Sequence, residues 1–135
     1  MPALTADRNT PLKDGEVIPV PVAANAVIYA GALVVANASG YAAPGSTATT
    51  LTYLGRAEEA VNNTGGANGA KTIQVRRKAA FKFANRVGDA GTQASLGKTC
   101  YIVDDQTVSA TNAGGNTQSA ASKVVGVESD GVWVE

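Results

Sequence analysis

Apolar and polar side chains alternate most regularly between residues 72 and 83. The apolar members are Ile73, Val75, Ala79, Phe81 and Phe83, and the polar members are Thr72, Gln74, Arg76, Lys78 and Lys82. A period of two is typical of a strand with one buried and one solvated face, so the pattern predicts such a strand here. Arg77 breaks the parity, which predicts either a bulge near Arg76-Arg77 or a side chain that snorkels out to water.

Two apolar stretches near the start of the chain predict further strands. Residues 17–22 contain Pro19 and Pro21, which cannot donate ladder hydrogen bonds, so we expect a sheet edge or an irregular strand there. Residues 27–36 form an apolar run rich in β-branched side chains, and Gly31 breaks it.

Turn residues divide the chain that follows into short segments. A turn at residues 37–40 leads into a short segment at 41–44, and residues 51–60 are a further candidate strand. Residues 62–69 read NNTGGANG, which we interpret as a polar loop with no capacity to pack. Residues 112–116 predict a second loose, glycine-rich loop.

The last third of the chain predicts one helical turn and two pairs of strands. The helical turn is expected within residues 90–96, and a strand at 99–103 turns at Asp104-Asp105 into a return at 107–108. Asp130-Gly131 lies between two valine-rich runs. This dipeptide predicts a hairpin with a type I′ turn, in which both central residues have positive φ.

These elements predict an all-β protein. Strands recur about every 8–15 residues and no long helix is expected, which favours a small, compact β-barrel or sandwich. At 135 residues the chain suits one domain, so we assign residues 16–135 to a single β-rich domain. Residues 1–15 contain Pro2, Pro11 and only scattered apolar side chains. We interpret them as an extended N-terminal arm, with a frayed tail as the alternative.

Composition narrows the functional classes. Aromatic residues make up only 5% of the chain, so the core must come from small aliphatic side chains, and self-association that buries more surface is favoured. The 11 basic residues equal the 11 acidic ones, whereas a dedicated nucleic-acid binder usually carries a basic excess. Histidine is absent and Cys100 is the single cysteine. We therefore expect no enzymatic activity, no metal site and no cofactor.

Two groups of residues invite a chemical interpretation that their spacing does not support. Gly97-Lys98-Thr99 looks like a phosphate loop, but Thr92 stands where that motif requires glycine, so we favour a turn entering a strand. Glu58-Glu59 and Asp104-Asp105 are carboxylate pairs. Adjacent residues on a strand point to opposite faces, so neither pair converges on one atom.

Arg76, Arg77, Lys78 and Lys82 form the main basic cluster. Contact with an acidic partner, protein or nucleic acid, is the functional interpretation. We favour the alternative, a solvated strand face whose lysines discourage edge-to-edge aggregation, because little aromatic interleaving is present.

No apolar run approaches the roughly 20 residues of a membrane span, and residues 1–15 lack the apolar stretch of a signal peptide. We therefore expect no membrane partner, and synthesis and folding in a reducing cytoplasm.

The order of the segments resembles a known family. An arm with proline and charges is followed by VIYAGALVV, NASGYAAPG, LGRAEEAVNNTGG, a basic VRR strand ending in FKFAN, GKTCYIVDDQTV and a closing DGVWVE. From about Leu4 to Glu135 this succession resembles the head decoration, or capsid cement, proteins of tailed phages and prophages.

The resemblance implies a structural role. Such proteins are similar in role to the lambda-type decoration proteins, which assemble as trimers with compact β-rich bodies and sit at three-fold and quasi-three-fold positions of expanded shells. It implies a homotrimer on the outer capsid surface of the virion that clamps neighbouring subunits of the major capsid protein. The host cytoplasm is the expected location before assembly, and no direct nucleic-acid contact is expected.

The resemblance also implies a role for the arm, because in related systems the N-terminal arm adds a strand to the capsid protein. That role falls here on Ala3, Leu4, Thr5, Ala6, Asp7, Arg8, Asn9, Thr10, Pro11, Leu12, Lys13 and Asp14. Two other functions stay open: another virion component, such as a tail or head–tail connector barrel, and a small nucleic-acid-binding β-barrel that uses the basic cluster.

Overall fold

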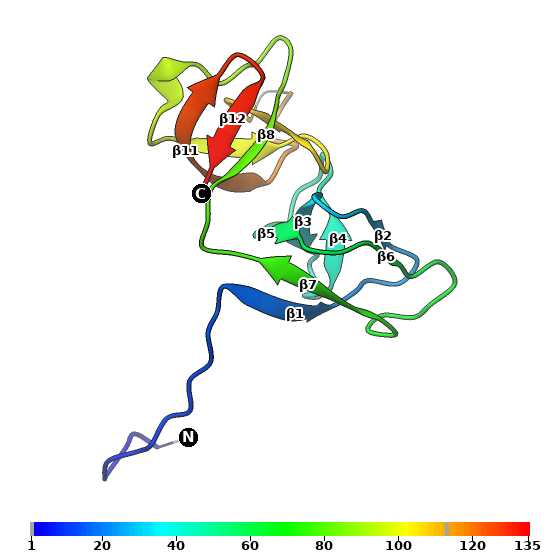
Figure 1. Cartoon of the computed structure of the whole chain (residues 1–135), viewed down its shortest axis with the longest axis vertical. Helices are drawn as coiled ribbons and strands as arrows, with labels where there is room; N and C mark the ends of the chain where they lie inside the picture. Colours follow the sequence, from blue (N-terminus) through cyan, green and yellow to red (C-terminus); the bar gives the residue numbers. More distant parts are fainter. Residues whose placement is uncertain (1, 113) are drawn as a thin grey trace.

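The computed structural model describes residues 2–112 and 114–135, and it shows a body built almost entirely of short strands (Figure 1). Met1 of the predicted arm and Ala113 of the predicted 112–116 loop lie outside the described residues. The strands are β1 (Val17–Pro21), β2 (Val27–Ile28), β3 (Leu33–Ala36), β4 (Ala42–Pro44), β5 (Thr52–Ala57), β6 (Val61–Asn62), β7 (Thr72–Arg76), β8 (Phe81–Asn85), β9 (Thr99–Ile102), β10 (Thr107–Ser109), β11 (Ala120–Glu128) and β12 (Gly131–Val134). One 3-10 turn, η1 (Gln93–Ser95), lies within the predicted helical turn. The predicted all-β class is confirmed.

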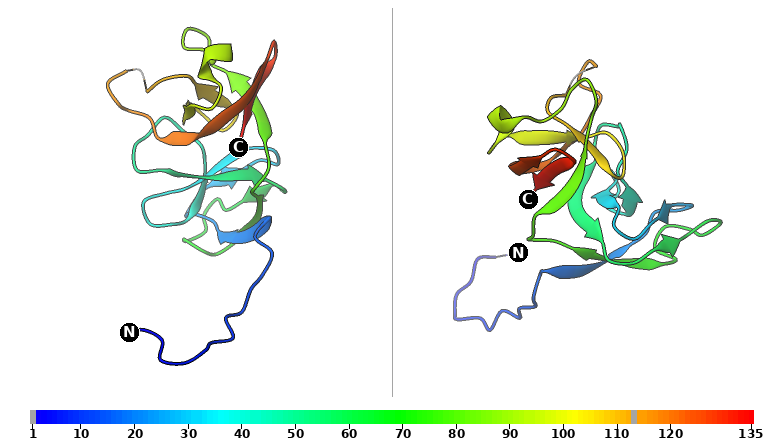
Figure 2. Two further views of the ribbon diagram at one scale, coloured as in Figure 1. Left: turned by 90° about the vertical axis from the view of Figure 1, so that its left-hand side faces the viewer. Right: turned by 45° about the horizontal axis from the view of Figure 1, so that its top comes forward.

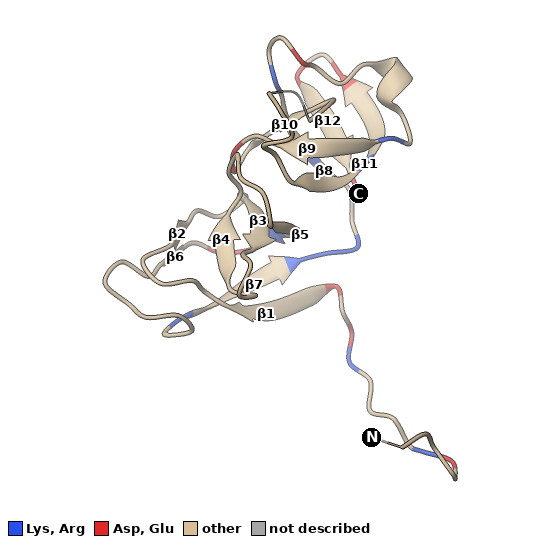
Figure 3. Ribbon diagram, turned by 180° about the vertical axis from the view of Figure 1, so that it is seen from behind, with Lys and Arg blue, Asp and Glu red and all other residues tan. Residues whose placement is uncertain are grey.

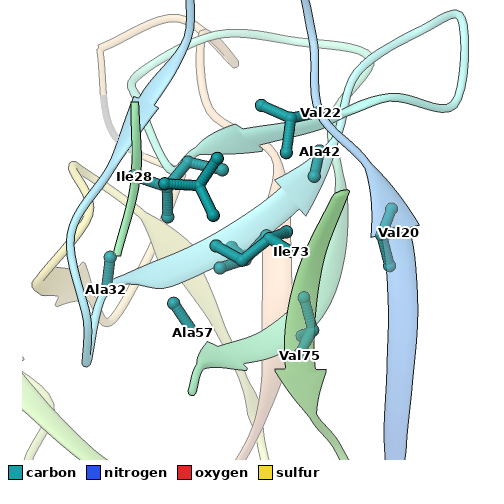
Figure 4. Close-up of a cluster of buried hydrophobic side chains, with 10 residues drawn as sticks. Val20, Val22, Ile28, Ala32, Ala42, Ala57, Ile73 and Val75 are labelled. Atoms are coloured by element: carbon teal, nitrogen blue, oxygen red, sulfur yellow. The ribbon is translucent and has the colours of Figure 1, made fainter. Parts of the chain in front are cut away.

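The first half of the body is a five-stranded sheet in the order β1-β7-β5-β3-β4, called here the N-terminal sheet. β1 is an edge strand, as Pro19 and Pro21 predict. An isolated bridge between Val22 and Ala42 joins the two outer strands at one end, so the sheet curves around its own core. The buried side chains of this core, many of them drawn in Figure 4, are Val20, Val22, Ile28, Ala32, Val34, Ala42, Ala57, Val61, Ile73 and Val75.

The second half is a closed barrel in the order β10-β8-β12-β11-β9, called here the C-terminal barrel. All pairings around it are antiparallel except the short parallel pair of β8 and β10. The side chains buried in this second core are Leu33, Val35, Phe81, Phe83, Cys100, Ile102, Val108, Val124, Val132 and Val134. Cys100 is 2% exposed and packs as a small buried hydrophobe.

β3 joins the two halves. Successive side chains of a strand point to opposite faces, so Val34 packs in the core of the N-terminal sheet while Leu33 and Val35 pack in the core of the barrel. The Leu33 amide also donates a hydrogen bond of 2.7 Å to the carbonyl oxygen of Asp105, in the β9–β10 turn. The sheet and the barrel therefore pack directly against each other, as the two views of Figure 2 show.

The single strand predicted over residues 72–83 is wrong. Its apolar side chains are buried as the alternation predicts, but they belong to two strands, with Ile73 and Val75 of β7 in one core and Phe81 and Phe83 of β8 in the other. The break comes at Lys78, whose φ of 57° is left-handed and cannot continue a strand. A period of two indicates which side chains of a strand are buried, but it does not indicate which sheet the strand joins.

The hairpin of β11 and β12 is present, but its turn is not the predicted one. Glu128 pairs with Gly131, so Ser129 and Asp130 form the two-residue turn, and φ is not positive at either of them. Gly131 is needed for a different reason. A Cβ atom there would lie 2.7 Å from the carbonyl oxygen of Phe83 on β8, so glycine permits the close approach of the two strands.

The 62–69 loop packs more tightly than the sequence predicts. Asn63 is only 1% exposed, and its Nδ2 donates hydrogen bonds to the carbonyl oxygens of Ala23, at 2.9 Å, and Ala67, at 3.1 Å. The prediction of a loop with no capacity to pack is therefore wrong. This polar side chain can be buried because the backbone of its own loop and that of the β1–β2 connection supply its hydrogen-bond partners.

Candidate partner-binding surface

Residues 3–14, assigned to a capsid-binding arm, lead away from the body without joining a strand (Figures 1 and 2). Every one of these residues is exposed, including Leu4 at 73% and Leu12 at 93%. Among the described residues, the hydrogen bonds of this segment are local. The Thr10 amide donates to the Arg8 carbonyl oxygen at 3.1 Å, and the Asp14 carboxylate accepts from the amide of Glu16 at 3.2 Å.

Leu4 and Leu12 are eight residues apart, an even number. In an extended chain they would project from the same face, because successive side chains alternate. Thr5 and Asn9 have the opposite parity and would project from the other face. Both leucines would therefore meet the same side of any surface on which the segment extends as a strand, with Ala6, Arg8 and Thr10 between them.

The arm runs directly into β1, whose one long pairing is with β7. The register places Val17 opposite Arg76 and Pro21 opposite Thr72, so the last residues of the arm emerge beside the point where β7 ends and the connection to the barrel begins. The Arg77 amide closes this corner by donating to the Glu16 carbonyl oxygen at 2.7 Å.

The structure divides the predicted basic cluster between separate elements. Arg76 lies in β7, Arg77 and Lys78 are exposed in the connection to the barrel, and Lys82 lies in β8. Figure 3 shows the first part of this run at the end of β7. Only Arg77 and Lys78 leave the strands as neighbouring exposed cations.

The strand cations are paired with carboxylates. Glu58 accepts hydrogen bonds from Arg56 and, at 3.2 Å, from Arg76. The Arg56 hydrogen bond, assisted by Arg76, holds the pKa of Glu58 below its ordinary value. The Arg56 guanidinium also lies 4.9 Å from the centre of the Phe81 ring, so it links β5 of the sheet to β8 of the barrel.

Lys82 is similarly engaged on the outer face of the barrel. Its Nζ lies 2.8 Å from Asp130 and 3.6 Å from Glu128, and it sits 5.8 Å from the centre of the Trp133 ring. The hydrogen bond to Asp130 raises the pKa of Lys82 and lowers that of Asp130. Trp133 is half-buried and donates from Nε1 to Glu128 at 2.8 Å. Arg76 and Lys82 are thus held by local acids.

The other motifs that suggested chemistry have structural roles. The Lys98 amide donates to the Ser95 carbonyl oxygen, and the Lys98 carbonyl oxygen accepts from Val124, so this motif is a turn that enters β9. The Asp104 carboxylate accepts from the Gln106 amide in the β9–β10 turn, and Glu59 accepts from the Gln74 amide. Residues 2–112 and 114–135 contain no cluster of three or more His, Cys, Asp or Glu suited to a metal ion.

One open hollow of about 340 Å³ lies where the two halves meet. It is lined by Tyr29, Ala30, Gly31, Ala32, Asp105 and Gln106. Tyr29 is 68% exposed there, and no functional role was predicted for it, because it falls within the apolar run of residues 27–36. Gly31, at φ +85°, turns the chain between β2 and β3 and leaves the ring outside both cores.

Two buried oxygens, the hydroxyl of Tyr53 and Oε1 of Gln118, have no hydrogen-bond partner among the described residues. Burial raises the pKa of Tyr53, and burial likewise raises that of the Cys100 thiol, which donates to the Ser122 carbonyl oxygen at 3.3 Å. Both residues lie at the barrel core and are shielded from reagents in water.

Among the residues that the structure describes, no helix has the length and apolar character needed to cross a membrane. Comparisons with protein-family models, with curated proteins and with solved structures gave no match.

Proposed function

We propose that this chain is a structural virion protein that binds the outer surface of an expanded phage capsid as a trimer. In this role it clamps neighbouring subunits of the major capsid protein, and the arm adds a strand to a capsid-protein sheet. The observation that carries the proposal is the fully exposed segment of residues 2–14, attached to a body of short paired strands. The succession of segments along the sequence supports the same role.

Strand addition suits this arm for a physical reason. Main-chain hydrogen bonds to a sheet edge supply affinity without a special side-chain sequence. The same-face leucines, Leu4 and Leu12, add apolar contacts on one side of the added strand. Ordering the arm costs conformational entropy, so binding requires a partner edge that is already in place, as on an expanded shell. In a trimer the three arms are linked, so once one arm has bound, the other two bind at a high effective concentration. The weak contacts of the single arms thereby add up to a strong attachment.

The first test adds the purified full chain to expanded capsid shells that lack it and counts the bound copies. We expect saturable binding near one copy per capsid subunit, and no binding to unexpanded shells. Failure to bind either form of the shell would overturn the proposal and direct attention to a tail, connector or nucleic-acid role.

A second test addresses the arm within the full chain. The double substitution L4S/L12S removes the two large apolar side chains of the arm and should weaken shell binding by about tenfold or more, since each exposed leucine side chain contributes on the order of 1 kcal/mol or more when buried. Because both side chains are exposed in the free protein, folding is unaffected. The matched control T5S/N9S changes the opposite face and should bind as the wild type does.

Removing residues 2–14 gives the strongest version of this test. The two cores draw their side chains from residue 18 onwards, so the shortened chain should retain the melting temperature and oligomeric state of the full chain while losing shell binding. A shortened chain that still filled the shell would remove the arm from the mechanism.

A further inference from the structure

The prolines of β1 lie on its outer edge. The Arg77 amide donates to the Glu16 carbonyl oxygen, and the Val22 amide donates to the Lys71 carbonyl oxygen, so even-numbered residues of this segment bond toward β7. Backbone groups of alternate residues face opposite edges in an antiparallel ladder. The nitrogens of Pro19 and Pro21 therefore face away from β7. Neither proline removes a hydrogen bond from the ladder.

The same arrangement recurs on β4, the other outer strand of the N-terminal sheet. The Tyr41 carbonyl oxygen accepts from Asn37, and the Gly45 amide donates to Leu33, so odd-numbered residues bond toward β3. Ala42 and Pro44 therefore face outward. The Ala23 amide confirms this direction, because it donates to the Ala42 carbonyl oxygen from the outer side at 2.9 Å.

All three prolines that lie in strands thus have their nitrogens at an outer edge of the sheet. The C-terminal barrel is closed and presents no edge of its own. Along the outer edge of β1 an incoming strand would meet the N–H group of Val17 but only the carbonyl oxygen of Pro19, so the hydrogen-bonded pair at Pro19 lacks its donor. Beyond Pro21 the bridge between Val22 and Ala42 already joins this edge to β4. Proline at such positions is a known means of blunting a sheet edge.

The arm has the opposite character. Its prolines, Pro2 and Pro11, flank residues 3–10, each of which retains a backbone N–H group. Every copy of the protein therefore carries an exposed segment competent to pair as a strand. In an oligomer, the arms of neighbouring copies are present at high local concentration. Without a block, the edge of another copy would be the nearest acceptor.

We propose that Pro19 and Pro21, with Pro44 on the opposite edge, prevent the arm of one copy from adding to the sheet of another. The arm is thereby reserved for a sheet edge on a different protein that offers both N–H and C=O groups. This inference rests on the proposed function only in treating the arm as a strand donor. It adds that the outer edges of the N-terminal sheet have been made poor acceptors.

The test restores the missing donors in the full chain with the double substitution P19T/P21T. Threonine favours strands, and neither outward position contacts a core, so the body should fold. Far-UV circular dichroism and the melting temperature check this directly. We expect sedimentation velocity to show assemblies larger than those of the wild type, with a weight-average mass that rises about twofold or more as concentration increases.

The control carries T5P/R8P in addition to P19T/P21T. These prolines remove one donor from each edge of the extended arm, so the larger assemblies should disappear. A P19T/P21T protein that is folded and no larger than the wild type would overturn the proposal. Large assemblies that persist with T5P/R8P would also overturn it, because the bodies would then be pairing without the arm.

A second measurement does not depend on self-association of the variant. A labelled peptide of residues 2–14 is titrated into wild-type protein and into P19T/P21T, and fluorescence anisotropy reports binding. Binding to the substituted protein alone supports the block, whereas equal behaviour of the two contradicts it. No shell is present in either assay, so these results are separate from success or failure of the capsid-binding proposal.

Discussion

The side-chain amide of Asn63 holds two loops of the N-terminal sheet in place. Its Nδ2 bonds to the carbonyl oxygens of Ala23 and Ala67, and both bonds are shielded from water because Asn63 is almost fully buried. Gly66 makes room for this side chain, since a Cβ atom there would lie 2.1 Å from Oδ1 of Asn63. A polar residue thus performs the packing role that an apolar residue has elsewhere.

Substitution N63A should lower the free energy of unfolding by roughly 1–3 kcal/mol, because it removes two hydrogen bonds and the packing of an almost fully buried side chain. The neighbouring N62A is the matched control. Asn62 is exposed and its Oδ1 accepts only a local bond from the Thr64 amide, so its loss should cost about 0.5 kcal/mol or less. Urea denaturation of both variants makes the comparison, and equal stabilities would contradict the role of Asn63.

The ionisation of Glu58 makes the stability of the folded protein depend on pH in the acid range. Its pKa is lowered in the folded state by Arg56 and Arg76, so its contribution to stability is complete above its ordinary value of 4.5 and is lost as the pH falls through the lowered pKa. The variant E58Q should therefore be less stable than the wild type at pH 7, and the two stabilities should converge as the pH falls through the lowered pKa of Glu58. Melting temperatures of the wild type and E58Q measured across this pH range make the comparison, and a difference that stayed constant with pH would contradict the role of Glu58.

At the scale of elements, β3 determines whether the two halves unfold together. It places Val34 in one core and Leu33 and Val35 in the other, and all three are fully buried. A strand that serves two cores couples them, because neither core is complete once the strand detaches. We therefore expect a single cooperative transition, as for a single domain.

The variant V34A tests this coupling. It removes apolar volume from the N-terminal sheet and should cost roughly 1–3 kcal/mol. The midpoint of urea unfolding, read from the fluorescence of Trp133 in the barrel, should fall by the same amount as the midpoint read from far-UV circular dichroism. V87A, at a side chain that is 97% exposed, should leave both midpoints in place. Separate transitions would show that the halves unfold independently.

At the scale of the whole molecule, Cys100 reports on opening of the barrel core. The thiol is buried, and burial raises its pKa, so both access and thiolate formation are suppressed in the folded state. A thiol reagent should therefore modify native protein more slowly than urea-unfolded protein by at least about a hundredfold, with a rate that follows global unfolding. V34A should accelerate the reaction if the cores are coupled. Rapid labelling of the native protein would contradict the buried position.

Several elements were predictable because their signals are local. Pro19 and Pro21 predicted an edge strand, Gly31 predicted a break in the apolar run, and the β9–β10 turn fell at Asp104-Asp105 as the polar dipeptide indicates. The exposure of Leu4 and Leu12 follows from a segment too polar and proline-rich to pack. These features depend only on residues close together in the chain, so the local sequence is sufficient to predict them.

The sequence by itself determined the all-β class, the alternation of buried positions and the exposure of residues 2–14. Only the tertiary structure decided that the alternating run of residues 72–83 divides between two sheets, that Asn63 is buried, and that Gly131 is needed for strand approach. It also decided which edge the strand prolines face. Each of these depends on backbone atoms supplied by distant segments, such as Phe83 for Gly131 and Ala23 for Asn63, and a local pattern carries no information about which distant strand will lie alongside.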